Sequence, residues 1–424
     1  MPDTLQNNKI LSSWKQIADF LGVSERTAQH WEQEKGLPVR RVSGAKGRIS
    51  ADAAELERWI QTKLHKVPWY SNVKYLRYCV GLSMALLILV TSILIGKYFA
   101  VNHLGPPARC HIDIDTLIVS DQNGREIWRK RFEDRLFAGA YSETGTTDYR
   151  KAWFGKLGPD RSVSTLFVYY PVSRETQGTA LICFSQTGNE VWRFVPGKVV
   201  SDFKGAHSPF YVVSDFHVTS LQPGGPVRIL VTSHHLFEHP NQLAVLDERG
   251  KTLAEYWHSG YLTHLDVEDI NGDGIKEILL GGINNGFGSA TLVVLDPRKV
   301  GGASAQARGD PRQLRGLGAG TEKAVIFFPR ACISQGLQYN RMFRMDAARS
   351  LVKAEVAESE DDTRATVIYT FDGNLSLQNV TISDHLKNIH NLMSAKGEID
   401  HPFSDAEEDN LRKRLRILGI GKGL

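Results

Sequence analysis

The chain has 424 residues, of which 42% are hydrophobic and 23% are charged. These ordinary values exclude a low-complexity or fibrous chain, and the length allows two or more domains with hydrophobic cores. The net charge of +4 is uneven, because residues 1–77 hold 13 Lys or Arg and 8 Asp or Glu, a net +5, which leaves −1 for the other 347 residues. This basic segment favours a polyanionic partner, either nucleic acid or an anionic membrane face, although a solvated basic surface has the same composition.

The first predicted elements are two short helices joined by a glycine. One face of the first helix carries apolar residues at positions i, i+3, i+4 and i+7, namely Trp14, Ile17, Ala18 and Leu21. Gly22 ends this helix, since glycine takes a left-handed turn without steric cost. Ser24 is a good N-cap for a second helix that buries Ala28 and Trp31. This spacing predicts a helix-turn-helix.

A basic hairpin and a third helix follow. Gly36-Leu37-Pro38 ends the second helix, and residues 39–42 and 48–50 flank a glycine-rich turn. Ser50 is expected to cap a third helix, whose inner face carries Leu56, Trp59, Ile60 and Leu64. Residues 11–64 resemble the winged helix-turn-helix of MerR-type and excisionase-type DNA-binding domains. The likeness rests on the S-x-R-T-x-x-x-W run, the G-L-P break, the basic hairpin and the closing helix.

That resemblance implies a second helix in the major groove of DNA and a hairpin, or wing, on phosphates or the minor groove. The candidate DNA-binding residues of the helix are Ser24, Glu25, Arg26, Thr27, Gln29 and His30, with Gln33 also facing outward. Arg26 and Gln29 have the donor geometry for base edges. The wing candidates for phosphate are Arg40, Arg41, Lys46 and Arg48. Each could instead be merely solvated, and membrane-tethered heads of the RodZ type bind a cytoskeletal protein, so a protein partner stays open.

The next element is a predicted transmembrane helix. Residues 78–96 contain no charge, and 19 helical residues span the hydrocarbon core of about 30 Å. No polar face exists at helical spacing, which disfavours a buried core helix. Basic residues near the span are more numerous on its N-terminal side than on its C-terminal side. The N-terminal side has Lys63, Lys66, Lys74 and Arg77, and the C-terminal side has Lys97 and Arg109. The positive-inside rule therefore predicts a cytoplasmic N-terminus and a single pass through the cell inner membrane.

Beyond the span, residues 110–380 read as short strands with turn signals. A loose repeat pairs an apolar strand, a polar glycine turn and a second strand, and it recurs at residues 116–124, 180–188 and 242–250, with a degraded copy at 290–297. The first two copies lead to Trp128 and Trp192, and the third to Ala254. Such periods suit β-propeller blades with insertions, with a plain β-sandwich as the alternative. A helical tail is expected over residues 381–424.

One loop carries a pattern of oxygen ligands. Residues 269–277 contain D-x-N-x-D-G-x-x-E, and the expected ligands are Asp269, Asn271, Asp273, the Ile275 carbonyl and Glu277. All-oxygen ligation at alternate positions suits Ca²⁺. The loop resembles the calcium loop of FG-GAP repeats in integrin-like propellers, although Glu277 stands where an Asp is more usual. The sequence predicts a structural calcium ion, and an Asx-rich turn without metal is the alternative.

The other polar residues predict no catalysis. Cys110, Cys183 and Cys332 allow one disulfide of undetermined pairing, and His234, His235 and His239 read as solvated loop residues. Neither a nucleophile elbow, an HExxH motif nor a phosphate-binding loop is present in the sequence. We therefore expect a protein that is not an enzyme.

Together these elements predict a multidomain chain, with a small helical head, one transmembrane helix and a large all-β domain. The expected divisions are a winged helix-turn-helix (1–66), a linker (67–77), the span (78–99), a spacer (100–109), an FG-GAP-type sensor (110–380) and the tail (381–424). This order is similar in architecture to ToxR- and CadC-type regulators, which implies transcription regulation by a dimer that responds to an extracytoplasmic ligand. The alternative is a membrane scaffold or adhesion protein whose head binds a cytoplasmic protein.

Overall fold

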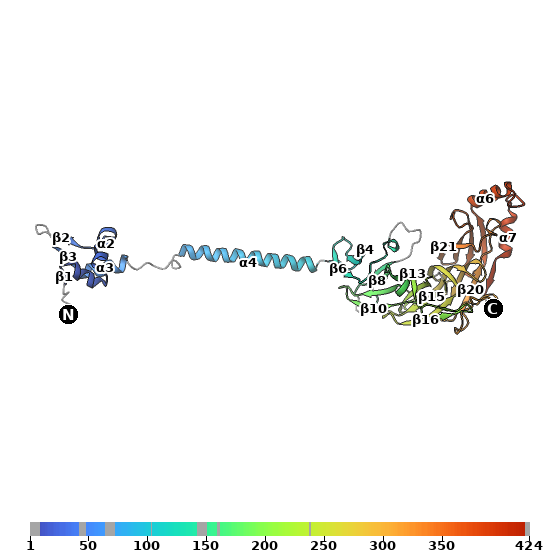
Figure 1. Cartoon of the computed structure of the whole chain (residues 1–424), viewed down its shortest axis with the longest axis horizontal. Coiled ribbons are helices and arrows are strands. Elements are labelled where there is room, and N and C mark those ends of the chain that lie inside the picture. Colours follow the sequence, from blue (N-terminus) through green and yellow to red (C-terminus); the bar gives the residue numbers. More distant parts are fainter. Residues whose placement is uncertain are drawn as a thin grey trace. The chain divides into compact units, whose positions relative to one another are not determined.

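The computed structural model describes residues 9–41, 48–63, 73–102, 104–141, 151–158, 162–236 and 239–419 (Figure 1). The chain forms two compact units, Met1–His103 and Leu104–Leu424. The described part of the first unit is helical apart from three short strands, and the second unit is mostly β-strand.

Residues 9–63, here called the head, pack three helices on a three-stranded sheet. Its helices are α1 (Trp14–Leu21), α2 (Glu25–Lys35) and α3 (Ala53–Lys63), and its strands are β1 (Ile10–Leu11), β2 (Arg40–Arg41) and β3 (Ile49–Asp52). Strand β3 pairs antiparallel with both of the others. The core that they share consists of Leu11, Ile17, Ala18, Ala28, Leu37, Ile49, Ala51, Leu56 and Trp59.

Two details of the head differ from the sequence-based prediction. Ser50 does not cap the third helix, because β3 continues to Asp52 and the Asp52 carboxylate accepts the amide N–H of Ala54 at 3.0 Å. Strand β1 was not predicted, since two residues are too few to show a periodic pattern. The predicted inner-face residue Leu64 lies outside the described residues.

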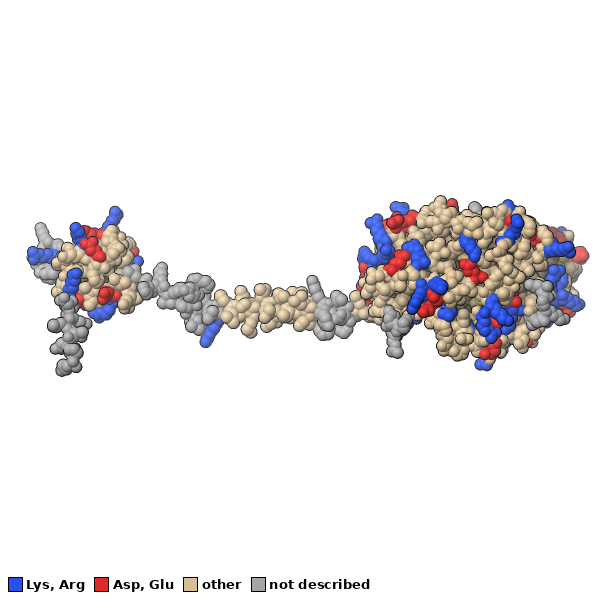
Figure 2. All heavy atoms as spheres, turned by 90° about the horizontal axis from the view of Figure 1, so that it is seen from below, with Lys and Arg blue, Asp and Glu red and all other residues tan. Residues whose placement is uncertain are grey.

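Helix α4 (Val73–Asn102) is the longest element of the chain, with 30 residues. Its segment Arg77–Gly96 is long and apolar enough to cross a membrane, with a mean hydropathy of 2.4, and none of that segment is buried. Figure 2 shows no charged side chain along its tan stretch. The predicted span, 78–99, falls inside this helix, which begins five residues earlier and ends three residues later.

Among the described residues, the second unit contains five larger antiparallel sheets that follow one another in chain order, and their consecutive strands are given below (Figure 1). Sheet one holds β4 (Arg109–Asp113), β5 (Thr116–Ser120) and β6 (Glu126–Arg131); sheet two holds β7 (Ala152–Gly155), β8 (Ser164–Tyr169), β9 (Ala180–Phe184) and β10 (Glu190–Phe194). Sheet three holds β13 (Tyr211–Ser220), β14 (Val227–His235), β15 (Asn241–Leu246) and β16 (Thr252–His258). Sheet four holds β17 (Gly260–Glu268), β18 (Glu277–Asn284), β19 (Ser289–Leu295) and β20 (Glu322–Phe327); sheet five holds β21 (Arg341–Ala348), β22 (Leu351–Ala357), β23 (Thr366–Asp372) and β24 (Leu377–Ile382).

The inner strands of sheets two, three and four are apolar on both faces because each of these sheets packs between two neighbours. In β9, Leu181 and Cys183 face sheet three, while Ile182 and Phe184 face sheet one. Successive side chains of a strand point to opposite faces, so a continuous apolar run serves two cores. Four such cores join the sheets pairwise, from sheet one to sheet five.

The sheets follow one another as propeller blades do, but the described residues form an open arc. None of the hydrophobic cores found among them joins sheet five to sheet one. Figure 1 places the teal first sheet and the orange fifth sheet at opposite ends of the unit. A pair of short strands, β11 (Val200–Ser201) and β12 (Ala206–His207), lies between sheets two and three in the chain.

The C-terminal segment is helical only in part. Helices α6 (Asp384–Ala395) and α7 (Ala406–Arg414) are followed by strand β25 (Arg416–Leu418), which pairs with β20 at the edge of sheet four. The helical tail predicted for residues 381–424 includes Ile417, whereas the last helix ends at Arg414 and Ile417 pairs with Ile326. The cause is a tertiary contact, because the open edge of β20 supplies hydrogen bonds that the helical pattern does not reveal.

The predicted repeat corresponds to the third and fourth strands of sheets two, three and four, and to β5 and β6 of the three-stranded sheet one. At the turn in sheet one, Asp121 accepts the backbone N–H groups of Asn123 and Arg125, each at 2.9 Å. Asp247 and Asp372 form the same turn in sheets three and five. The copy at Asp372 was not predicted as a repeat, and its turn geometry shows it to be a fifth.

Tryptophans of the repeat pack against the turn glycine of the next sheet. A Cβ atom on Gly188 would lie 2.7 Å from the Trp128 ring, and one on Gly250 would lie 2.6 Å from the Trp192 ring. The indole N–H of Trp192 also donates to the Glu248 carbonyl at 3.1 Å. Gly124, at the same turn of sheet one, has nothing within 4 Å of such a Cβ atom, since no sheet precedes it.

This contact predicts different costs for the same substitution at two matched turns. Gly124 and Gly250 have φ of 79° and 77°. Both Gly→Ala variants should therefore lose about 1–2 kcal/mol for the left-handed backbone. Gly250→Ala should lose a further 1–3 kcal/mol, roughly, from overpacking against Trp192. Equal free energies of unfolding in denaturant titrations of the two variants would contradict this account of sheet packing.

Candidate functional site

The first candidate site is the exposed face of helix α2, and a tight turn positions it. Gly22 has φ of 67°, the left-handed conformation that the sequence predicts. The Ser24 side chain accepts the amide N–H of Thr27 at 3.2 Å and caps α2. Ala18 and Ala28 are both buried, which lets α1 and α2 approach closely. The turn and the small residues together fix the orientation of α2 in the head.

The outward side chains of α2 are exposed as predicted, and they are Glu25, Arg26, Gln29, His30 and Gln33. His30 lies 3.2 Å from Glu34, so part of this face is occupied by a local pair. The Ser24 and Thr27 hydroxyls hydrogen-bond each other at 2.7 Å. These two candidates therefore act in the cap, which leaves Arg26 and Gln29 as the exposed donors.

The basic hairpin beside α2 carries exposed arginines that are already paired with acidic residues. Arg40 lies 2.8 Å from Glu55, and Arg41 lies 3.1 Å from Glu32. Their side chains are 75% and 71% exposed, and such surface pairs contribute about 0–1 kcal/mol. Phosphate groups can therefore replace the carboxylates at small cost. Arg48 is exposed, and Lys46 lies outside the described residues.

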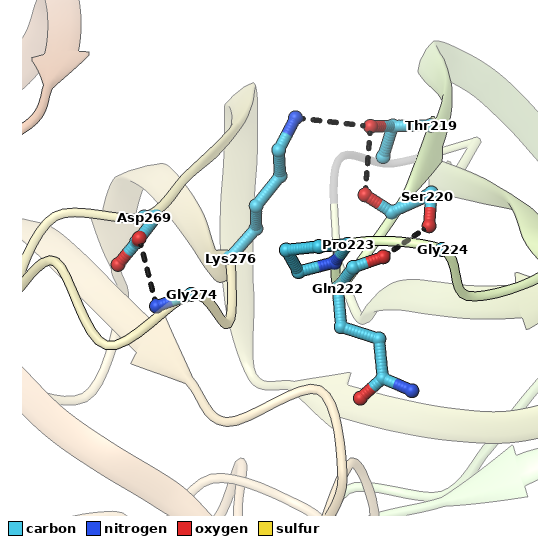
Figure 3. Close-up of a pocket in the computed structure, with 8 residues that line it drawn as sticks. All are labelled: Thr219, Ser220, Gln222, Pro223, Gly224, Asp269, Gly274 and Lys276. Atoms are coloured by element: carbon cyan, nitrogen blue, oxygen red, sulfur yellow. Dashed lines mark hydrogen bonds between the residues drawn. The ribbon is translucent and has the colours of Figure 1, made fainter.

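The second candidate site is the loop between β17 and β18, shown in Figure 3. The side chains of its first three predicted ligands accept backbone N–H groups of the same loop, and Asn271 and Asp273 do so in Asx turns. Asp269 accepts the amide N–H groups of Gly272 and Gly274 at 2.8 and 2.9 Å. Asn271 accepts from Asp273, and Asp273 accepts from Ile275. The Ile275 amide and, further off, Lys323 and Arg298 hold the pKa of the Asp273 carboxyl below its usual range.

The fifth predicted ligand does not complete a cation shell. Glu277 is 3% exposed, and its Oε1 atom lies 2.7 Å from the Lys323 ammonium. Its Oε2 atom accepts the amide N–H of Ile270 at 3.2 Å. Among the described residues, the loop carboxylates do not form a group of three ligands within 4.8 Å of one another. In this arrangement Lys323, and not an ion, neutralises the Glu277 carboxylate, and the calcium site stays a prediction.

A recess of about 330 Å³ adjoins the loop, and no sequence motif predicts it. Figure 3 shows its lining, to which Thr219, Ser220, Gln222, Pro223 and Gly224 contribute from one side, and Asp269, Gly274 and Lys276 from the other. The Lys276 ammonium donates to the Thr219 hydroxyl at 3.3 Å. Lys276 and Asp269 line the recess with opposite charges, so its lining favours neither anions nor cations.

Two of the three histidines that the sequence places in a loop lie instead at the end of a strand. His234 and His235 end strand β14, and the ring of His207 lies 5.4 Å from His235 and 5.7 Å from His239. Burial lowers the pKa of His235 and of His239, and the neighbouring His207 lowers both further. His207 itself lies 3.1 Å from Asp202. His207 was missed because it is 28 residues before His235 in the chain.

No family model matches the chain. The prophage DNA-packing protein NohA of Escherichia coli (strain K12) is 47% identical over 45 residues, which are 11% of this chain and 23% of that protein. The chain thus spans about a quarter of the length of this curated relative. The solved Dos1 propeller matches 64% of this chain and 55% of its own at 12% identity, with a TM-score of 0.34. BamB from Moraxella catarrhalis matches 64% of this chain and 63% of its own at 12% identity, with a TM-score of 0.30.

The pairing of Glu277 with Lys323 predicts how the unit responds to calcium. We expect excess Ca²⁺ and excess EDTA to give the same melting temperature for the wild-type chain, since Lys323 already neutralises the carboxylate. Lys323→Met frees Glu277 and should make the melting temperature rise with Ca²⁺.

The control is Lys323→Met combined with Asp273→Asn, which removes a second loop carboxylate and should abolish the calcium response. A calcium-dependent rise in the wild type that Asp273→Asn abolishes would contradict this account. It would show instead that the ion displaces Lys323, as the loop pattern alone predicts.

Proposed function

We propose that the chain is a membrane-anchored transcriptional regulator that binds DNA through its head. The observation that carries the proposal is the exposed, polar face of α2 beside a hairpin with three exposed arginines, on a unit that continues into an apolar helix. The head is then a winged helix-turn-helix of MerR or excisionase type, with α2 as its recognition helix. The name of the relative NohA, a DNA-packing protein, agrees with DNA as a partner.

In this proposal each basic residue has one of two tasks. Arg26 and Gln29 read base edges in the major groove, where their donors match guanine and adenine. Arg40, Arg41, Lys46 and Arg48 contact phosphates, which position the head without reading sequence. The carboxylates of Glu32 and Glu55 hold two of these arginines until DNA replaces them.

The proposed topology places the head in the cytoplasm and the second unit outside it, with one pass through the inner membrane. The excess of Lys and Arg before the span supports this orientation. The second unit then acts as the sensor of an extracytoplasmic ligand, and we assign it binding and not catalysis. A dimer suits the short half-site of one head, and Gly81 and Ala85 allow close contact of two spans.

A second candidate function is a membrane scaffold or adhesion protein whose head binds a cytoplasmic protein. The observation that favours it is the acidic component of the same surface. Glu25 and Glu34 are exposed on α2, and Arg40 and Arg41 are partly neutralised by their pairs. A protein partner tolerates such mixed charge better than DNA does.

Salt dependence distinguishes the two functions. We expect the full chain in nanodiscs to bind duplex DNA with an affinity that falls steeply as salt rises. Replacing Arg40, Arg41, Lys46 and Arg48 by Ala should flatten the slope of log K against log salt by roughly 3–4 units, because each lost phosphate contact removes about 0.9. Fluorescence anisotropy across a salt series measures this slope.

Arg58→Ala is the matched control, since Arg58 is exposed on α3 and outside the proposed contacts. Its slope should equal that of the wild type. Absence of DNA binding at low salt would remove the regulator proposal and leave the scaffold. An equal loss of slope in Arg58→Ala would show a nonspecific charge effect.

A further inference from the structure

The C-terminal segment brings together three potential metal ligands that the sequence did not single out. Cys332 begins a short 3-10 turn after β20, His401 lies between α6 and α7, and Glu407 lies in the first turn of α7. Their donor atoms all lie within 4.8 Å of one another, and no other such group was found among the described residues. The 68 residues between Cys332 and His401 give no short ligand spacing, which is why the sequence does not reveal the group.

The three side chains already converge on one point. The buried Glu407 carboxylate holds His401 through Oε1 at 2.8 Å from Nε2, and it accepts the Cys332 thiol through Oε2 at 3.2 Å. Glu407 is 6% exposed, so its position is fixed by packing. The His401 side chain is 42% exposed, which gives an ion a route from solvent.

A second carboxylate orients the imidazole. Asp400 Oδ1 lies 2.6 Å from His401 Nδ1, so Nε2 faces Cys332 and Glu407. The buried His390 of α6 holds the backbone of His401 in place. Its Nε2 atom lies 3.2 Å from the His401 carbonyl oxygen. A carboxylate on the far nitrogen of a ligating histidine is the arrangement that sets its tautomer and ring orientation in metal sites.

We propose that Cys332 Sγ, His401 Nε2 and a carboxylate oxygen of Glu407 bind one Zn²⁺ ion. A thiolate, an imidazole and a carboxylate suit zinc, whereas Ca²⁺ and Mg²⁺ take oxygen ligands. Three protein ligands leave one tetrahedral position for water or an exchangeable ligand. Binding displaces two protons to solvent, the thiol proton of Cys332 and the Nε2 proton that His401 donates to Glu407, and the sulfur and the metal keep their oxidation states.

The ion would join parts of the second unit that are distant in the chain. Cys332 lies on the connection from sheet four to sheet five, while His401 and Glu407 belong to the segment that ends in β25. Zinc would therefore fasten α7 beside the connection between the two sheets. This inference stands apart from DNA binding, because the head contributes no residue to the site.

The test measures metal binding by the full chain in detergent, purified with a tag free of histidine. After EDTA treatment and its removal, we expect one Zn²⁺ per chain by elemental analysis, and a thiolate-to-metal charge-transfer band with Co²⁺. Cys332→Ser and His401→Gln should each remove the stoichiometric ion. Asp400→Asn keeps every ligand and should weaken zinc affinity by about 10–100-fold.

Two control variants should bind zinc as the wild type does. Cys110→Ser removes a half-buried thiol elsewhere, and His385→Gln removes a histidine that also pairs with an aspartate. A chain that binds no zinc, or equal zinc affinity in the wild type, His401→Gln and Asp400→Asn, would overturn the proposal. The cluster would then be a hydrogen-bonded clamp without metal. Circular dichroism of each variant identifies any that fail to fold. If a ligand variant does not fold, the zinc affinity of Asp400→Asn, which keeps every ligand, tests the proposal.

Discussion

The arrangement of the chain depends on the solvation of one helix. Residues 78–96 carry no charge, and their side chains are exposed to whatever surrounds α4. In water, so much unburied apolar surface would be strongly unfavourable, at about 25 cal/mol per Å². In lipid the same surface is stable, and every backbone hydrogen bond of the helix is satisfied internally. In the proposed topology, the head and the second unit lie on opposite sides of the membrane that this helix crosses.

The second unit is stabilised by contacts between neighbouring sheets. Inner strands carry apolar residues on both faces, and Trp128 and Trp192 fit against glycines that leave space for an indole ring. This dependence on neighbours leaves outer surfaces at the two ends of the arc and open edges on the sheets. Strand β25 covers one such edge, at β20, and thereby holds the C-terminal segment near the connection that carries Cys332.

The sequence predicts local features of this structure well, because short-range geometry determines them. Gly22, Ser24 and the apolar face of α1 are where spacing places them, and three of the polar turns coincide with real hairpins. The features that it does not predict arise from contacts distant in the chain. Lys323 is 46 residues from the Glu277 that it neutralises, and Ile417 leaves a helical pattern to pair with Ile326. Local spacing singled out the oxygen-bearing side chains of the loop, but it could not show which of them had another partner.

In the proposed function, one chain carries a DNA-binding head and a sensor on opposite sides of a membrane. The most direct measurement is the retention of labelled duplex DNA by inner-membrane vesicles of known orientation that contain the full chain. The account predicts retention by inverted vesicles, in which the cytoplasmic head faces outward, and none above background by right-side-out vesicles. Retention by both orientations, or by neither, would contradict it.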